Sequence, residues 1–227
     1  MEAELKSCTK KARHHLPAWP TNHSVNFIYL FLIEHLMRLI LTRHGETIEN
    51  AQGIHQGHLP GKLSDLGIKQ AKKLAKRLKD EKIDVIYSSD LARAADTAKE
   101  ILKFHPNTPI KFVKELREKD AGDFQGKKKG ESGLSKNANL NHGETFKQLF
   151  DRAEKFLHEI LHIHINDIVL FVGHNKINKA ILCVITDRPS KEIEDMEHLK
   201  NASISIFDID EKKNHKIHVF NCIKHLD

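Results

Sequence analysis

From Met37 onward, short apolar runs alternate with segments of helical periodicity, and this alternation restricts the possible folds more than any other feature. The apolar runs predict strands at residues 37–42, 84–88, 110–113 and 168–172. Between and after them, apolar residues at three- and four-residue spacings predict amphipathic helices over residues 65–80, 90–104, 146–163 and 177–184. Such alternation is typical of a mostly parallel sheet that is covered by helices on both faces.

The C-terminal part departs from this pattern. Ser203 to Ile209 and Lys216 to Phe220 are both strand-like, and the polar segment 210–215 lies between them. Two strands joined by a short polar segment predict an antiparallel hairpin. We therefore expect a three-layer α/β/α sandwich whose sheet is mostly parallel with an antiparallel edge.

The chain of 227 residues is long enough for one large core, and its character changes at Met37. Residues 1–36 begin with basic side chains and contain the apolar run Phe27 to Ile33, which Glu34 and His35 interrupt. This run is far shorter than the roughly 20 apolar residues of a membrane span, and no small-residue cleavage site follows it. We expect residues 37–227 to form the domain, and residues 1–36 to be a poorly ordered extension or the product of a misassigned start.

Charge and cysteine content narrow the partners and the compartment. The 37 Lys and Arg exceed the 31 Asp and Glu by only 6, and they are mixed with acidic residues along the chain. This pattern favours a small anionic substrate over nucleic acid or a membrane. Cys8, Cys183 and Cys222 are odd in number and lack CxxC spacing, which favours neither a disulfide framework nor a zinc site. The prediction is a cytoplasmic monomer or homodimer.

Basic side chains follow three of the predicted parallel strands. Arg43 and His44 follow the first strand, Arg93 lies shortly after the second, and His174 follows the fourth. Ligands of such sheets bind beyond the carboxyl ends of the strands. One such residue alone would be interpreted as a surface or hydrogen-bonded group, but two guanidiniums and two imidazoles at one point repel each other by several kcal/mol unless an anion lies among them. The sequence therefore predicts a phosphate pocket.

A more specific motif surrounds the first of these positions, Arg43-His44-Gly45-Glu46, and further motifs follow it in order. With them the chain resembles the histidine phosphatase superfamily, also called the phosphoglycerate mutase-like family. The resemblance implies that family's fold and phosphoryl-transfer chemistry. It extends over nearly all of residues 37–227 through Thr47, Asn50, Gln56-Gly57, Leu63-Ser64, Gly67, Gln70-Ala71, Ser88 to Ala94, Thr97, Leu116-Arg117-Glu118, Gly122, Gly126, Gly143-Glu144-Thr145, Arg152 and Val172-Gly173-His174.

The resemblance implies that His44 is the nucleophile, which becomes a phosphohistidine that water later hydrolyses. A neutral imidazole has one nitrogen with a free lone pair, and a carbonyl or carboxylate partner on the other nitrogen would fix the tautomer. Arg43, Arg93 and His174 are implied to act with it by holding the phosphoryl oxygens, because planar guanidiniums match phosphate geometry. The expected substrate-binding set is completed by Asn50, Gln56, Gly57 and Asn175, the last standing where many relatives have Gly.

The position of the family's proton donor matches Glu118. Glu118 would protonate the leaving alkoxide and then act as base for the incoming water. Partial burial and a nearby phosphate dianion would keep Glu118 protonated until the leaving alkoxide takes its proton. Asp120 and Asp123 are close rivals, and only the alignment of the motif favours Glu118.

No metal or other cofactor is expected. His158 and His162 would share a helix face with His164 close by, but the sequence shows no acidic or thiol partner to complete a site, and we interpret all three as solvated histidines.

The segment between Glu118 and His174 is short, whereas the mutases of this family carry a longer insertion there that closes over the substrate. Only a short lid, residues 126–143, is expected here, and a wetter pocket favours hydrolysis of small phosphorylated metabolites. The alternative is a cofactor-dependent phosphoglycerate mutase. A third hypothesis, a non-catalytic module that binds phosphorylated ligands, predicts the loss of a catalytic residue, and none is missing. Lys127, Lys128 and Lys129 at the start of the lid are candidates for binding a second anionic group of the substrate.

Overall fold

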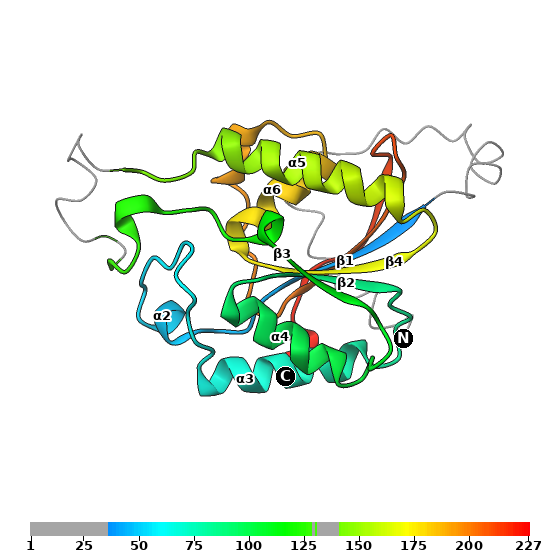
Figure 1. Ribbon diagram of the computed structural model, residues 1–227, viewed down its shortest axis with the longest axis horizontal. Helices are drawn as coiled ribbons and strands as arrows, with labels where there is room; N and C mark the ends of the chain where they lie inside the picture. Colours follow the sequence, from blue (N-terminus) through cyan, green and yellow to red (C-terminus); the bar gives the residue numbers. More distant parts are fainter. Residues whose placement is uncertain (1–35, 129, 131–140) are drawn as a thin grey trace.

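The computed structural model describes residues 36–128, 130 and 141–227. Its centre is a six-stranded sheet in the order β3-β2-β4-β1-β5-β6 (Figure 1). The four strands β1 (Met37–Arg43), β2 (Val85–Ser89), β3 (Ile110–Val113) and β4 (Ile168–Gly173) pair in parallel. The hairpin of β5 (Ile204–Ile209) and β6 (His215–Cys222) adds the antiparallel edge. The predicted sandwich and its hairpin are thus confirmed.

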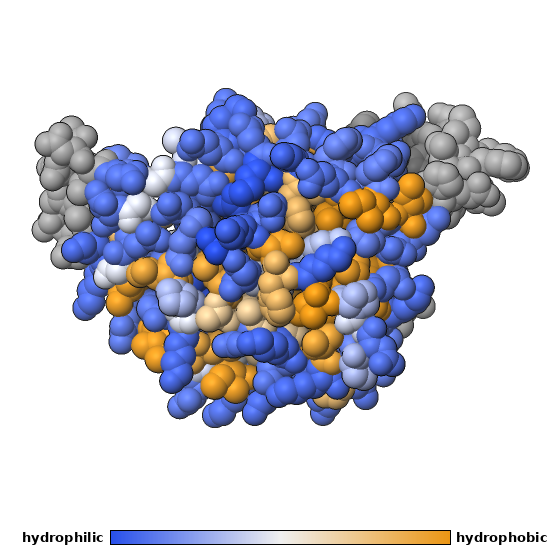
Figure 2. Space-filling model, viewed as in Figure 1, coloured by the Kyte–Doolittle hydropathy of each residue, from blue (hydrophilic) through white to orange (hydrophobic). Residues whose placement is uncertain are grey.

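Two pairs of helices cover the sheet. Figure 1 shows α5 (Phe146–Ile163) and α6 (Asn175–Ile185) on one side, and α3 (Asp65–Leu78) and α4 (Ala92–Leu102) on the other. Each pair closes its own hydrophobic core against the sheet. On the face shown in Figure 2 hydrophilic residues predominate, as expected for helices that turn only one side to a core.

Polar side chains cap the starts of α3 and α5. The Thr145 side chain accepts a hydrogen bond from the Gln148 amide, and Gln148 returns one to the Thr145 backbone, so α5 begins with a capping box. The Ser64 hydroxyl caps α3 by accepting from the Gly67 amide. The helix predicted over residues 146–163 has the bounds observed for α5. The observed helix α4 is shorter at both ends than the helix predicted over residues 90–104.

The strand register decides where the site forms. Strands β1 and β4 are parallel neighbours in which Arg43 pairs with Gly173. The residue after each strand is a histidine, and the His44 amide donates to the Gly173 carbonyl at 3.1 Å. His44 and His174 consequently leave the sheet side by side at its carboxyl edge. Strand β2 ends at Ser89 on the same edge, and Arg93 follows in the first turn of α4.

Some expectations lie outside the described residues or need correction. The extension 1–36, apart from Leu36, and most of the predicted lid 126–143 fall outside them. Cys183 is free and buried, but Cys222 is disulfide-bonded. The prediction from cysteine number and spacing, which favoured no disulfide, was therefore wrong for Cys222. Sequence spacing carries no information on which sulfur atoms approach in space. Within the described ranges, no helix has the length and hydropathy needed to cross a membrane.

Candidate active site

A cavity of about 690 Å³ opens at the carboxyl edge of the parallel strands. Its walls come from the loops that follow β1 and β3, from the starts of α4 and α6, and from residues 194–198. Of the nine residues that the sequence predicts for the site, eight line this cavity: Arg43, His44, Asn50, Gln56, Gly57, Arg93, Glu118 and Asn175. The ninth, His174, is fully buried beside it, with its ring edge-on to that of His44 at 5.0 Å.

The hydrogen bonds of His44 fix its tautomer. Its Nδ1 lies 2.6 Å from the Gly45 carbonyl oxygen, which can only accept, so Nδ1 carries the proton and Nε2 keeps a free lone pair. Burial holds the pKa of His44 well below its usual range, and the nearby Arg93 and Arg43 charges lower it further. The imidazole is therefore neutral at physiological pH, and its Nε2 lone pair is available to an electrophile. The sequence predicts a carbonyl or carboxylate partner on one ring nitrogen of His44, and that partner is the Gly45 carbonyl.

Close backbone packing holds His44 in place. A Cβ atom on Gly45 would lie 2.5 Å from the Gly67 carbonyl oxygen, so any side chain there would push α3 away. The Gly45 amide also donates to the Thr97 hydroxyl at 3.1 Å. Glu46 points elsewhere, since its carboxylate accepts from the Ser64 hydroxyl at 2.8 Å. Of the motif residues, His44 is the one that lines the cavity together with Arg43, while Gly45 allows the close backbone packing.

His174 presents a buried donor that no described residue satisfies. Its Nδ1 accepts a hydrogen bond from Arg93 Nε at 3.1 Å, so the proton of the neutral ring lies on Nε2. Burial, followed by the charge of Arg93, holds the pKa of His174 well below its usual range. Among the described residues, His174 Nε2 has no hydrogen-bond partner. A buried N–H without a partner costs about 1–3 kcal/mol, which a phosphoryl oxygen would recover.

Two buried guanidiniums supply positive charge. Arg43 donates from one terminal nitrogen to His198 Nε2 at 2.8 Å and to the Leu199 carbonyl at 2.7 Å. In the described part of the chain its Nε has no partner. Arg93 is held by the Gly57 carbonyl at 2.8 Å and the Leu59 carbonyl at 2.6 Å. Burial lowers the pKa of each arginine to about 10, so both remain charged near neutral pH and favour an anion between them.

Amide side chains complete the inner pocket. Asn50 Oδ1 accepts from the Thr47 amide and from Asn201 Nδ2, both at 3.3 Å, which leaves its NH₂ group available to the cavity. Gln56 Oε1 is buried and has no partner among the described residues. Asn175 differs from the others, because its Oδ1 accepts from the Leu199 amide at 3.0 Å and so holds the cavity wall.

Glu118 is the one carboxylate of the three candidates that lines the cavity. Its oxygens accept from the backbone amides of Lys176 at 2.9 Å and Ile177 at 3.2 Å, at the start of α6. Asp120 instead accepts from the Gly122 amide, and Asp123 accepts from the Asn141 amide. The geometry thus separates Glu118 from its rivals, which the sequence did only by motif alignment.

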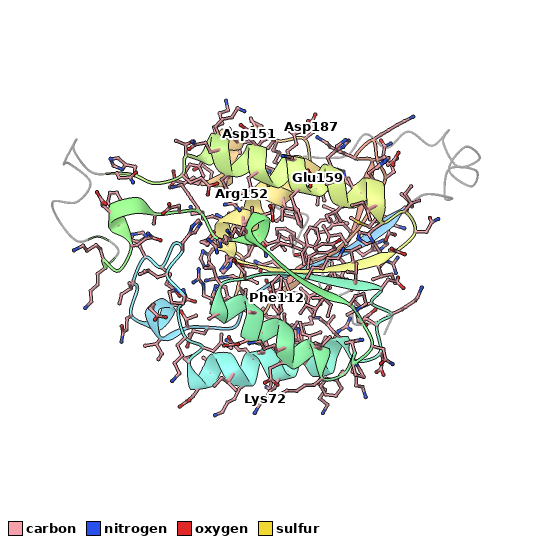
Figure 3. The ribbon with its side chains drawn as sticks, in the orientation of Figure 1. Lys72, Phe112, Asp151, Arg152, Glu159 and Asp187 are labelled. Atoms are coloured by element: carbon pink, nitrogen blue, oxygen red, sulfur yellow. The ribbon has the colours of Figure 1, made fainter. Side chains whose placement is uncertain are left out.

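Arg152 fixes the loop that carries Glu118. It projects from α5 toward the segment after β3 (Figure 3) and donates to the Glu115 carbonyl at 2.6 Å and the Arg117 carbonyl at 3.0 Å. A second terminal nitrogen and Nε bind the Glu144 carboxylate at 2.7 and 2.9 Å. The motif residues Glu144 and Arg152 therefore support the Glu118 loop from outside the cavity.

Sequence reasoning missed several residues of the site. Asn201 donates to the His44 carbonyl at 3.0 Å as well as to Asn50, and His198 contacts Arg43. Both lie between α6 and β5, in a segment without periodicity or motif, where no sequence signal could have marked them. Lys119 and Lys176 also line the cavity and stand next to residues that the motifs did identify.

The histidines near the end of α5 do not behave alike. His158 and His162 are exposed, as expected, but His164 is buried. Its Nε2 lies 2.8 Å from the Tyr87 hydroxyl and its Nδ1 lies 2.8 Å from Asp167. The prediction of a solvated His164 was wrong, because this residue ends the helix and turns toward the sheet. In the described ranges, no group of three or more His, Cys, Asp and Glu residues is arranged to hold a metal ion.

Comparison with known proteins agrees with this geometry. The model of the family described as "Histidine phosphatase superfamily (branch 1)" matches residues 39–222. A metal-independent phosphoserine phosphatase from Arabidopsis thaliana is 34% identical over 189 residues, which cover 77% of each chain. The crystal structure of an α-ribazole phosphatase from Shigella flexneri superposes with a TM-score of 0.73 at 27% identity, covering 82% of this chain and 96% of that one. A phosphoserine phosphatase from Entamoeba histolytica, solved with 3-phosphoglyceric acid, gives a TM-score of 0.71 at 25% identity, covering 84% and 100%.

Proposed function

The chain belongs to the histidine phosphatase superfamily (branch 1), and on that premise we propose that it hydrolyses small phosphorylated metabolites through a phosphohistidine formed on His44. It is a histidine-type phosphatase, a phosphoric monoester hydrolase, by its family and by the names of its relatives. The phosphohistidine intermediate and the roles of individual residues are what we propose.

One observation carries the proposal. Two buried donors have no partner among the described residues: Arg43 Nε belongs to a residue that lines the cavity, and His174 Nε2 lies beside it, next to the neutral His44 whose own Nε2 keeps its lone pair. Buried polar groups are normally satisfied, so such a set indicates a ligand rich in acceptor oxygens. A phosphoryl group supplies those oxygens and the electrophilic phosphorus as well.

The first half-reaction uses these groups together. His44 Nε2 attacks phosphorus in line with the ester oxygen, and the P–O bond to the alcohol breaks. Arg43, Arg93, His174 and the Asn50 amide hold the phosphoryl oxygens while charge spreads over them. Glu118, in its protonated form, gives its proton to the leaving oxygen.

The second half-reaction reverses these roles. Glu118, now a carboxylate, takes a proton from water, the water oxygen attacks the phosphohistidine, and the P–N bond to His44 breaks. The products are inorganic phosphate and free His44. A single general acid contributes roughly 10²- to 10⁴-fold, so the fixed positive groups must supply most of the acceleration.

The substrate stays at the level of a small phosphomonoester. The relatives named above are a phosphoserine phosphatase and an α-ribazole phosphatase, and identities near 30% do not transfer either specificity. The cytoplasmic location, the monomeric or homodimeric state and the absence of nucleic-acid partners stay predictions from the sequence.

A direct test is hydrolysis of p-nitrophenyl phosphate in the presence of EDTA, next to a phosphoglycerate mutase assay with 3-phosphoglycerate and bisphosphoglycerate. We expect phosphate release that EDTA does not affect, and no mutase activity. Mutase activity that exceeds phosphate release would favour the mutase alternative. Binding of phosphorylated ligands without any turnover would favour the non-catalytic module.

A further inference from the structure

Outside the phosphoryl pocket, the cavity contains two lysines that share one aromatic ring. Lys176 Nζ lies 5.1 Å from the centre of the Phe146 ring, and Lys119 Nζ lies 5.6 Å from it. All three residues line the cavity. Cation–π contacts hold the stems of both lysines without neutralising their charge.

Neighbouring carboxylates leave these two ammonium groups without a close ion pair in the described part of the chain. Lys119 donates to the Asp120 backbone carbonyl at 3.3 Å, and Lys176 approaches the exposed Glu194 carboxylate only at 4.0 Å. The other carboxylates that act on Lys119 are held elsewhere: Glu144 by both branches of Arg152, Asp120 by the Gly122 amide, and Glu118 by the amides at the start of α6. Burial lowers the pKa of Lys119, so its charge lies in a partly desolvated position.

The third lysine of the cavity does not belong to this pair. Lys179 is buried and donates to the backbone carbonyls of Met196 and Glu194. Its ammonium group therefore fixes residues 194–196 and is not free to bind a ligand. Lys119 and Lys176 are the lysines of the described cavity wall that remain available.

Their place in the site identifies the part of the substrate that they face. Lys119 follows Glu118 in the chain, and the backbone amide of Lys176 holds the Glu118 carboxylate at 2.9 Å. Glu118 must face the ester oxygen in order to protonate it, so the alcohol part of the substrate extends on this side.

We propose that Lys119 and Lys176 bind a second anionic group, a carboxylate or a phosphate, on the alcohol part of the substrate. The substrate class is then a small phosphomonoester that carries another acid group. This inference rests on the proposed function and deepens it. It also replaces the expectation from the sequence, since Lys127 and Lys128 are not among the residues that line the described cavity, and Lys129 lies outside the described residues.

The test uses substrates that differ in this one charge. 3-Phosphoglycerate and glycerol 3-phosphate differ by a carboxylate, and fructose 1,6-bisphosphate and fructose 6-phosphate differ by a phosphate. We expect wild-type kcat/KM to favour the doubly acidic member of at least one pair by about tenfold or more, the range of a charge-assisted hydrogen bond. The pair that shows the preference tells a carboxylate from a phosphate.

The variant Lys119→Met/Lys176→Met then loses this preference by about tenfold, whereas Lys119→Arg/Lys176→Arg keeps most of it. Lys72→Met is the matched control, because Lys72 is an exposed lysine on α3, on the far side of the sheet from α5 (Figure 3). A preference near one in the wild type for both pairs, or one that survives in the Met variant, overturns this inference alone. A wild-type protein that hydrolyses none of these esters nor p-nitrophenyl phosphate overturns the proposed function, and this inference with it.

Discussion

Arg93 Nε donates a hydrogen bond to His174 Nδ1 at 3.1 Å, and this contact determines which nitrogen of His174 carries the proton. It forces the proton of His174 onto Nε2, where no described residue accepts it. The same guanidinium is fixed by the backbone of residues 57–60. One arginine therefore supplies charge, orients a neighbouring donor and connects two loops of the site.

Replacing Arg93 tests this relationship. In Arg93→Ala the pocket loses a charge and the constraint on His174, and we expect kcat/KM for p-nitrophenyl phosphate to fall by roughly 10²-fold or more. Arg77→Ala is the control, since Arg77 lies near the end of α3, pairs with Glu81 just after that helix and does not line the cavity. Turnover within a few-fold of wild type in Arg93→Ala would refute the assigned pocket.

The buried histidines predict how stability depends on pH. His44 and His174 have folded-state pKa values well below 6.5, mainly because of burial, while the unfolded chain binds protons near 6.5. As the pH falls below about 6.5, the unfolded state therefore takes up more protons than the folded state. The free energy of unfolding then decreases by up to about 1.4 kcal/mol per pH unit for each histidine. Burial lowers the pKa of His225 to about 4, and this histidine acts in the same direction.

Urea unfolding at pH 7.5 and pH 5.5 measures this effect. We expect the free energy of unfolding to decrease toward pH 5.5 in the wild type, and to decrease less in His44→Gln/His174→Gln. The double variant keeps His225, so part of the pH dependence remains. Equal pH dependence in the two proteins would mean that these histidines are not held neutral in the folded state.

Gly45 is predicted to tolerate no side chain. A Cβ atom would meet the Gly67 carbonyl oxygen at 2.5 Å, backbone that cannot yield without a shift of α3. We expect Gly45→Ala to destabilise the fold by about 1–3 kcal/mol and to lower kcat as His44 moves. Thermal unfolding and steady-state kinetics measure the two effects. An unchanged melting temperature together with an unchanged kcat would show that the contact is not tight.

Asn201 is predicted to be a positioning residue. Its amide donates to the His44 carbonyl and to Asn50 Oδ1, and so turns the Asn50 NH₂ group toward the cavity. Loss of these neutral hydrogen bonds in Asn201→Ala is worth about 0.5–1.5 kcal/mol. We therefore expect kcat/KM to fall up to about tenfold, and inorganic phosphate to inhibit more weakly by a similar factor. A stability loss without a change in phosphate inhibition would indicate a structural role only.

The fold follows from the sequence because its signals are local and repeated. Apolar runs of strand length, helical periodicity and the C-terminal hairpin all point to the same kind of sheet, whereas the order of the strands comes from the structure alone. The inner pocket was also within reach, since parallel strands bring Arg43, His44 and His174 to one edge. What they do there still needs the motif, because position alone assigns no role.

Other parts of the site depend on contacts between distant segments. Asn201 and His198 reach His44 and Arg43 from an irregular segment, and Lys119 and Lys176 come from distant parts of the chain to the same Phe146 ring. His164 was misjudged for the same reason, as its partner Tyr87 lies 77 positions away in the chain. Neither periodicity nor local charge records such contacts.

The most direct test of the central claim is to trap the intermediate on His44. The wild-type protein is mixed with a phosphomonoester that it hydrolyses, and the reaction is quenched at alkaline pH. We expect the protein to carry a PO₃ group that peptide mass spectrometry locates on His44. Acid should remove the group and base should not, and His44→Gln should show neither the adduct nor turnover. Full turnover by His44→Gln, or an adduct on another residue, would contradict the account.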